Sequence, residues 1–222
     1  MQTAHSLNPH YFELCAQGTR RILEEGFTPA RGGDISLRDP ATNLVYVSAG
    51  LADIPFPCSS FSEVEAPDPA VFTLDGKQLC GDKLATIELP MHLAILRARP
   101  DVHCVLHTHA PWSTVFAMIG RELPRFPLEQ EAWGPSFSVS TAGYAPAGAM
   151  EVGDFAVEAL GDRPAVMLAC HGAVAVGESM ERAFANARLL EKQALTFAYE
   201  KLLTGGYENG LQNGPPNQHV SA

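Results

Sequence analysis

Residues 102–109 read VHCVLHTH, an apolar run that ends in two histidines separated by a single residue. The run has the pattern of a buried β-strand. Residues two apart on a strand project to the same face, so His107 and His109 point together where the strand ends. Two imidazoles aimed at one point make half of a zinc site. The pair also fits one core histidine beside one surface histidine, so it indicates a metal without defining one.

A third histidine follows another apolar strand, expected over residues 165–169. His171 comes directly before Gly172, and a glycine lets backbone and ligand approach closely. Alone, this is equally the pattern of a turn histidine. Together with His107 and His109, however, it supplies the third imidazole of a three-histidine catalytic site.

Glu88 lies near the start of a helix expected over residues 85–99, before Pro100. A carboxylate there usually complements the helix dipole, and spacing alone does not separate that role from a metal ligand or a general base. His92 follows one helical turn later on the same face. It is either structural or a support for the ligands.

Apolar periodicity predicts helices alternating with strands along the chain. Helices are expected over residues 9–26, 85–99, 110–119, 150–160 and 180–203, and strands over 35–37, 44–48, 71–74 (at a sheet edge), 102–108, 137–140, 165–169 and 173–176. We therefore expect an α/β protein, a three-layer α-β-α sandwich around a central mixed sheet, in a single domain. The domain should span residues 1–203, and residues 204–222, rich in Asn, Gly, Gln and Pro, should form a flexible tail.

Overall composition narrows the function classes. The 222 residues carry a net charge of −10, which argues against nucleic acid or an anionic membrane as partner. No run approaches the ~18 apolar residues of a membrane span, and the N-terminus lacks an export signal. The five cysteines are scattered without a CxxC pair, which favours reduced thiols and a cytoplasmic location.

Three motifs together resemble the class II aldolase/adducin family. Residues 88–109, ExxxHLAILRARPDVHCVLHTH, look like the family core. Residues 32–38, GGDISLR, match its GG-x-hydrophobic-S-hydrophobic-R pattern, and residues 171–174, HGAV, match its HG-hydrophobic motif before a long C-terminal helix. Order and spacing agree over residues of about 10–203, so the combination is far more specific than the two histidines alone.

The resemblance implies roles for these residues. The family's metal ligands fall on His107, His109 and His171. Its ligating glutamate, which can swing off the metal to act as acid/base, falls on Glu88. The implied cofactor is one Zn²⁺, or Mn²⁺ or Co²⁺, per subunit.

The implied activity is that of a metal-dependent lyase. It would cleave or form a C–C bond of a small hydroxylated carbonyl compound by aldol chemistry through a metal-stabilised enediolate. A decarboxylase or dehydratase acting on a non-phosphorylated acid at the same site stays open. So does a non-catalytic adducin-like scaffold, although a scaffold has no use for the histidines and the glutamate. The resemblance also implies a homotetramer with active sites between subunits.

The family's phosphate-binding positions are altered. Gly-Asn, Thr-Gly and Ser-Ser pairs donate hydrogen bonds to phosphate in the family, and here the corresponding residues are 33–34, 49–50 and 86–87, reading GD, AG and TI. The loss of two or three charge-assisted hydrogen bonds costs about 3 to 6 kcal/mol of binding, which argues against a phosphorylated sugar. Arg31 is either a carboxylate anchor or a solvated surface residue. The candidate substrate contacts are Gly33, Asp34, Gly50, Thr86 and Arg31.

The sequence does not identify which residue acts as a second acid/base. The tyrosine that some aldolases use as a proton donor is not evident after the two histidines. Carboxylates at Glu129 and Glu131 and phenols at Tyr144 and Tyr207 are the candidates.

Overall fold

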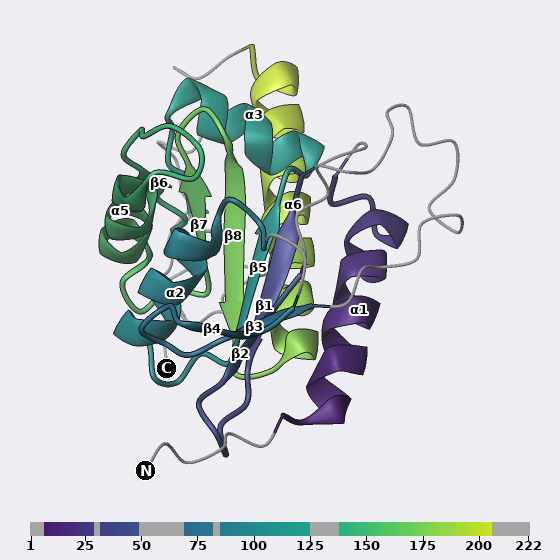
Figure 1. The fold of residues 1–222 in the computed structure, drawn as a ribbon. Coiled ribbons are helices and arrows are strands. Elements are labelled where there is room, and N and C mark those ends of the chain that lie inside the picture. The colour runs from purple at the N-terminus through teal and green to yellow at the C-terminus, as the bar shows by residue number, and fades with distance from the viewer. Residues whose placement is uncertain (1–6, 29–31, 49–68, 82–84, 125–137, 206–222) are drawn as a thin grey trace, which may run out of the picture.

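An eight-stranded sheet runs through the protein (Figure 1), in the order β4-β3-β2-β1-β5-β8-β7-β6. The computed structural model describes residues 7–28, 32–48, 69–81, 85–124 and 138–205. The strands are β1 (Asp34–Arg38), β2 (Val45–Val47), β3 (Ala70–Phe72), β4 (Gln78–Cys80), β5 (Cys104–Thr108), β6 (Thr141–Ala142), β7 (Ala165–Leu168) and β8 (Gly172–Gly177). Neighbouring strands are antiparallel except for the parallel pair β6–β7. The expected mixed sheet is confirmed.

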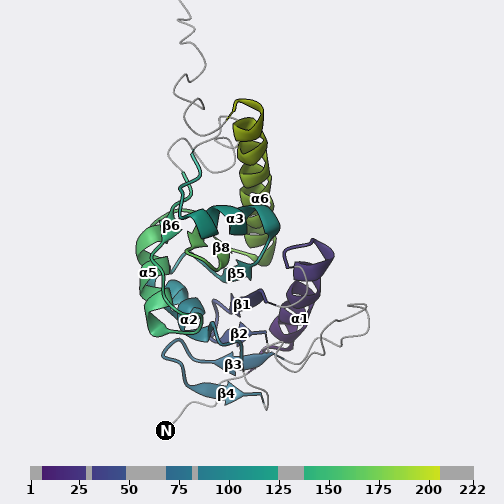
Figure 2. The ribbon, with the colours of Figure 1, turned by 90° about the horizontal axis from the view of Figure 1, so that it is seen from above.

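Helices cover both faces of this sheet. They are α1 (Pro9–Glu24), α2 (Leu89–Ala98), α3 (Pro111–Ile119), α5 (Met150–Leu160) and α6 (Met180–Leu203). Figure 2 shows α2 and α5 on one side of the sheet and α1, α3 and α6 on the other. Each side has its own apolar core. The chain is therefore the three-layer α-β-α sandwich that the alternation of elements predicts.

The side chains of strand β5 alternate between the two apolar cores. Cys104 and Leu106 pack into the core shared with α1, α3 and α6, and Val105 packs into the core shared with α2 and α5. Because side chains alternate between faces, His107 lies on the same side as Val105. The α2–α5 side is therefore the side of the sheet on which a histidine site can form.

Helix α2 begins at Leu89, four residues later than the expected start at residue 85. A start at residue 85 would put Pro90 at the sixth helical position, where its missing N–H would break the hydrogen-bond ladder. In the observed helix Pro90 lies in the first turn, where that N–H has no partner to lose. Glu88 therefore lies at the N-cap position of α2, where its side chain makes no capping hydrogen bond and is available for other contacts.

Two strand predictions are wrong in detail, and one strand is missing from the predictions. Residues 71–74 are predicted at a sheet edge, but β3 pairs with β2 on one side and β4 on the other. The edge strand β4 is not predicted, because its three residues, none fully buried, are too few to show an alternation. Of residues 137–140, the described part forms only an isolated bridge between Val139 and Leu123, and β6 follows at Thr141.

The structure describes the C-terminal segment only as far as Gly205. Thr204 and Gly205 follow α6 as a turn, and the rest of the expected flexible tail lies outside the described residues. No helix within the described ranges is long and apolar enough to cross a lipid bilayer.

We expect Phe184→Ala to lower the free energy of unfolding by about 3 to 5 kcal/mol, because a fully buried aromatic side chain leaves a cavity. Phe184 is 0% exposed, and its ring lies 6.0 Å from that of Phe27. The matched control on the same helix is Arg182→Ala, which removes a half-exposed side chain and should change stability by less than about 0.5 kcal/mol. Urea unfolding followed by circular dichroism measures both. Equal losses would contradict this description of the core.

Candidate metal centre

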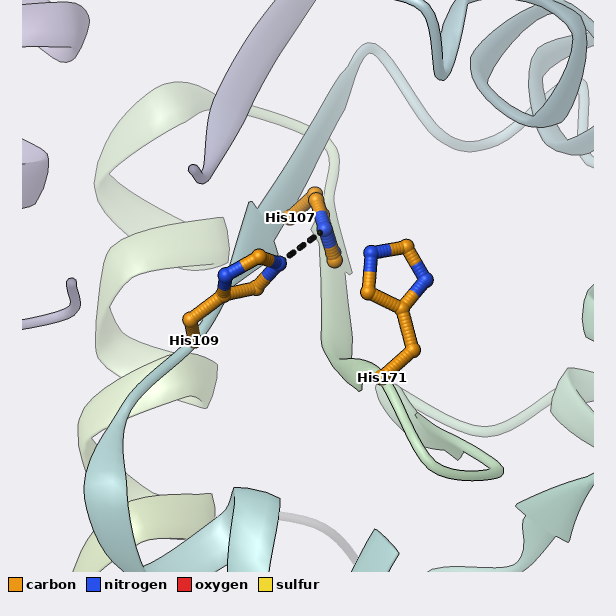
Figure 3. A group of neighbouring side chains, drawn as sticks. All are labelled: His107, His109 and His171. Carbon is orange, nitrogen blue, oxygen red and sulfur yellow. Dashed lines mark hydrogen bonds between the residues drawn. The ribbon is translucent and has the colours of Figure 1, made fainter. Parts of the chain in front are cut away.

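Three histidines meet at one end of the central strands (Figure 3). His107 lies on β5, His109 directly follows that strand, and His171 lies in the turn between β7 and β8. One ring nitrogen from each lies within 4.8 Å of the others. The antiparallel register of β5 with β8, which puts His107 opposite Val174, carries the β7–β8 turn to the two histidines of β5.

A tight turn aims His171 at the other two rings. Cys170 adopts a left-handed backbone conformation with φ of 57°, and its N–H donates to the Ala117 carbonyl. A Cβ on Gly172 would lie 2.3 Å from the Thr108 carbonyl oxygen, so the close approach of this turn to β5 requires glycine. Steric exclusion of a Cβ therefore explains why a glycine follows His171.

The ring of His107 is oriented by the backbone. Its Nδ1 lies 3.0 Å from the Ala173 carbonyl oxygen. Because a carbonyl only accepts, Nδ1 carries the proton and the lone pair of Nε2 is left for a ligand. Nε2 of His107 and Nε2 of His109 are 3.0 Å apart, close to the roughly 3.3 Å expected between two nitrogens bound tetrahedrally to one zinc ion.

All three imidazoles favour the neutral form. Burial lowers the pKa of His107 to about 3, even though the charge of Asp34 acts in the opposite direction. Burial is also the main reason why the pKa values of His109 and His171 lie below the usual value. Neutral imidazole is the form that binds a metal ion.

Glu88 brings a carboxylate to the same place. It is 3% exposed, its Oε1 accepts the Gly148 N–H at 3.0 Å, and Oε1 lies 3.9 Å from Nε2 of His171. Its Oε2 is buried and has no hydrogen-bond partner among the described residues. Burial, followed by the charge of Asp34, raises the pKa of Glu88, while His92 and Gly148 act against this.

The donor set fits a divalent metal. One ring nitrogen from each of the three histidines lies within 4.8 Å of the others, so together they could hold a metal ion. The buried oxygen of Glu88 without a partner is costly, and a cation bound next to it would stabilise it. Three nitrogens and one oxygen are a common zinc ligand set.

Asp34 and Thr86, two of the expected substrate contacts, are bound to each other. Asp34 is 7% exposed; its Oδ1 lies 2.6 Å from Nε2 of His92, and its Oδ2 accepts the Thr86 hydroxyl. Burial favours a higher pKa for Asp34, but the charge and hydrogen bond of His92, together with the charge of His107 and the hydrogen bond of Thr86, outweigh burial, so the pKa is well below the usual value. Nδ1 of His92 lies 2.7 Å from Oγ of Ser36. Sequence reasoning missed this network, because Asp34 and His92 are 58 residues apart.

The glycine pair before β1 lies against the histidines. A Cβ on Gly32 would lie 2.4 Å from Nδ1 of His109, and a Cβ on Gly33 would lie 3.1 Å from the His107 carbonyl oxygen. Both glycines have positive φ, 97° and 77°. Gly33 therefore has a packing role, whatever its contact with substrate.

The remaining candidates are only partly described. Tyr144 is 65% exposed. The others lie outside the described residues: Arg31, Gly50, Glu129, Glu131 and Tyr207.

Fold and site together define a cluster of three histidines that could hold a metal ion, on an α-β-α sandwich. The family model described as Class II Aldolase and Adducin N-terminal domain matches residues 13–197, and the chain belongs to this family. Its relatives include a 5-deoxy-D-ribulose 1-phosphate aldolase from Bacillus thuringiensis, 33% identical over 81% of this chain and 79% of that protein. A 3-oxo-tetronate 4-phosphate decarboxylase from Escherichia coli is 29% identical over 78% of this chain and 79% of that protein.

A solved structure of an L-fuculose 1-phosphate aldolase is similar throughout. It superposes with a TM-score of 0.81 at 25% identity and covers 90% of this chain and 91% of that one. The resemblance read from the motifs is confirmed, and the chain is an enzyme of the class II aldolase type. Class II aldolases are metal-dependent, in agreement with the possible three-histidine site.

We expect Gly32→Ala to weaken metal binding at least about tenfold, in the range found when groups that orient metal ligands are changed. The added Cβ would meet the His109 ring and displace it. The matched control is Gly26→Ala, which has the same positive-φ strain (φ of 72°) but nothing within 4 Å of the new atom. Competition with a chromogenic chelator measures both affinities. Equal weakening in the two variants would contradict the steric argument.

Proposed function

We propose that this protein is a lyase that cleaves, or forms, a C–C bond of a small hydroxylated carbonyl compound. In this proposal His107, His109 and His171 hold one Zn²⁺ per subunit and Glu88 is both the fourth ligand and the catalytic acid/base. The supporting observation is the convergence of one buried and two half-buried imidazoles beside a carboxylate with an unpartnered oxygen. Mn²⁺ and Co²⁺ are the alternatives, and three nitrogens with one oxygen favour zinc.

The metal would supply the positive charge that stabilises the enediolate developing on the substrate when the bond breaks. In the cleavage direction, the hydroxyl on the departing carbon gives up its proton, that carbon leaves as an aldehyde, and the bond's electrons remain on the enediolate. The enediolate carbon then takes a proton. These proton transfers need a group within hydrogen-bond reach.

Glu88 is suited to the proton transfers. Its Oε1 is held by the Gly148 N–H, so Oε2 is the oxygen left to take and return a proton. Burial raises the pKa of Glu88, and a raised pKa brings a carboxyl group closer to the pH at which it can both accept and donate.

Decarboxylation is the second candidate reaction. The 29% identity to a protein named as a decarboxylase supports it, because loss of CO₂ from a 2-hydroxy-3-oxo acid leaves the bond's electrons on an enediolate, which the same centre would stabilise. Aldehyde release and CO₂ release distinguish the two reactions.

The first test compares Glu88→Gln and His109→Ala. Glu88→Gln should keep metal, since three imidazoles remain, and should lower kcat/KM by roughly 10²- to 10⁴-fold. His109→Ala should lose both metal and turnover. Elemental analysis gives metal per chain, and a panel of hydroxyketones and keto acids, with and without phosphate, gives turnover.

The matched control for these variants is His103→Ala. His103 precedes β5 and lies four residues before His107, and its replacement should leave metal content unchanged. A wild type without metal would overturn the lyase proposal and bring the adducin-like scaffold forward.

We also propose a homotetramer with active sites between subunits. Three large apolar side chains near Glu88 and Gly148 are exposed: Ile87 (70%), Tyr144 (65%) and Met150 (63%). Such side chains close to a polar site are typical of a surface that a partner covers. Light scattering coupled to gel filtration should give four chains per particle, and a monomer at micromolar concentration would contradict the proposal.

We infer a cytoplasmic location. Free thiols support it, because disulfides are rare in that compartment. The free thiols of the described residues are Cys15, Cys80, Cys104 and Cys170.

A further inference from the structure

The buried carboxylate of Asp34 has no role in the proton transfers proposed for Glu88. It lies beside the centre: in the sheet Asp34 is directly opposite His107, and its charge acts on all three histidines and on Glu88. Burying a charge costs free energy unless the charge is paired, so the contacts of Asp34 beside the proposed reaction site require an explanation.

The hydrogen bonds around Asp34 account for the donors next to Glu88. The Thr86 hydroxyl donates to Oδ2 of Asp34, and its oxygen accepts the Glu88 N–H at 3.2 Å. The His92 ring bonds Oδ1 of Asp34 through Nε2. The hydroxyl proton of Thr86 and the Nε2 proton of His92 are therefore both directed at Asp34.

This conclusion does not depend on the protonation of His92. If the ring is neutral, Nε2–H donates to Asp34 and Nδ1 accepts the Ser36 hydroxyl. If the ring is cationic, both nitrogens donate, one to Asp34 and one to Ser36. In either state neither proton is left for a substrate anion.

The Asp34 carboxylate has more acceptor positions than this network uses. A carboxylate offers about four acceptor positions, and Asp34 uses two in the contacts with His92 and Thr86. It can still accept hydrogen bonds from substrate hydroxyls. Phosphate oxygens are acceptors themselves and carry negative charge, so they meet repulsion here instead of donors. The neighbouring Ile87, 70% exposed, presents a side chain without donors.

We propose that Asp34, fixed by His92 and Thr86, is a specificity-determining residue that makes this enzyme select non-phosphorylated hydroxycarbonyl substrates over their phosphate esters. The inference rests on the proposed lyase function and names its substrate class. It separates this chain from the relatives whose names specify phosphate esters.

The experiment uses the metal-loaded full-length protein and one matched pair of donors. Dihydroxyacetone and dihydroxyacetone phosphate are each condensed with acetaldehyde, and their binding is measured by calorimetry. Wild type should favour dihydroxyacetone by at least about tenfold in kcat/KM and should bind it more tightly than the phosphate ester, because the anion meets a carboxylate. Asp34→Asn keeps the shape of the side chain, removes the charge and adds a donor. It should shift the ratio towards the phosphate ester by at least about tenfold.

The matched control is Asp101→Asn. Asp101 is an exposed carboxylate paired with Arg99 just before the start of β5, and its replacement should leave the donor ratio unchanged. Melting temperature and metal content establish that each variant is folded and loaded. If Asp34→Asn does not fold, the two wild-type arms still decide the question.

Two results overturn the inference: a wild type that prefers the phosphate ester, or a folded Asp34→Asn variant with the wild-type ratio. Failure of the lyase proposal looks different. In that case the metal-loaded wild type turns over neither donor, and the relative binding of the two donors still tests the role of Asp34.

Discussion

The antiparallel pairing of β5 with β1 on one side and β8 on the other is the constraint on which the rest depends. Register puts His107 opposite Asp34 in β1 and opposite Val174 in β8. The first pairing sets a carboxylate beside the histidine, and the second brings the turn that carries His171. A slip of one residue would turn His107 towards the opposite core, so the apolar side chains that fix the register also assemble the metal centre.

The two buried carboxylates of the site, Asp34 and Glu88, differ in their hydrogen-bond partners and in the direction of their pKa shifts. Both oxygens of Asp34 have partners, and its pKa lies below the usual value because His92, His107 and Thr86 together outweigh burial. Glu88 keeps one buried oxygen without a partner, and burial raises its pKa. A satisfied carboxylate is a fixed charge, whereas an unsatisfied one gains from binding either a cation or a proton. Asp34 is thus suited to the substrate-selecting role proposed for it, and Glu88 to the proposed metal-binding and proton-transfer role.

The sequence was informative where a signal is local. Alternation along β5 predicts that His107 and His109 point together, and the bounds of α5 and α6 follow from their apolar stripes. The signal failed where geometry depends on packing between distant segments. Edge strand β4 has only three residues, none fully buried, which is too few to show an alternation. The contact between Asp34 and His92 exists only because α2 packs on the sheet. The residue spacing within the motif of Asp34 or the motif of His92 does not predict it.

If His107, His109 and His171 bind the metal and Asp34 selects the substrate, as proposed, the two roles depend on different contacts of the fold. The three imidazoles come from strand ends whose positions the sheet fixes, and a change there disrupts hydrogen-bonded register. The network around Asp34 joins β1 to α2 and the turn before it through side chains alone. Side chains on a packed helix can be exchanged in compensating pairs without moving a strand. A carboxylate at position 34 needs a partner such as His92 to be buried at all, so the two residues are best understood as one unit. Under the proposals above, a change in this unit would alter which substrates the enzyme accepts, while the three histidines stay in place.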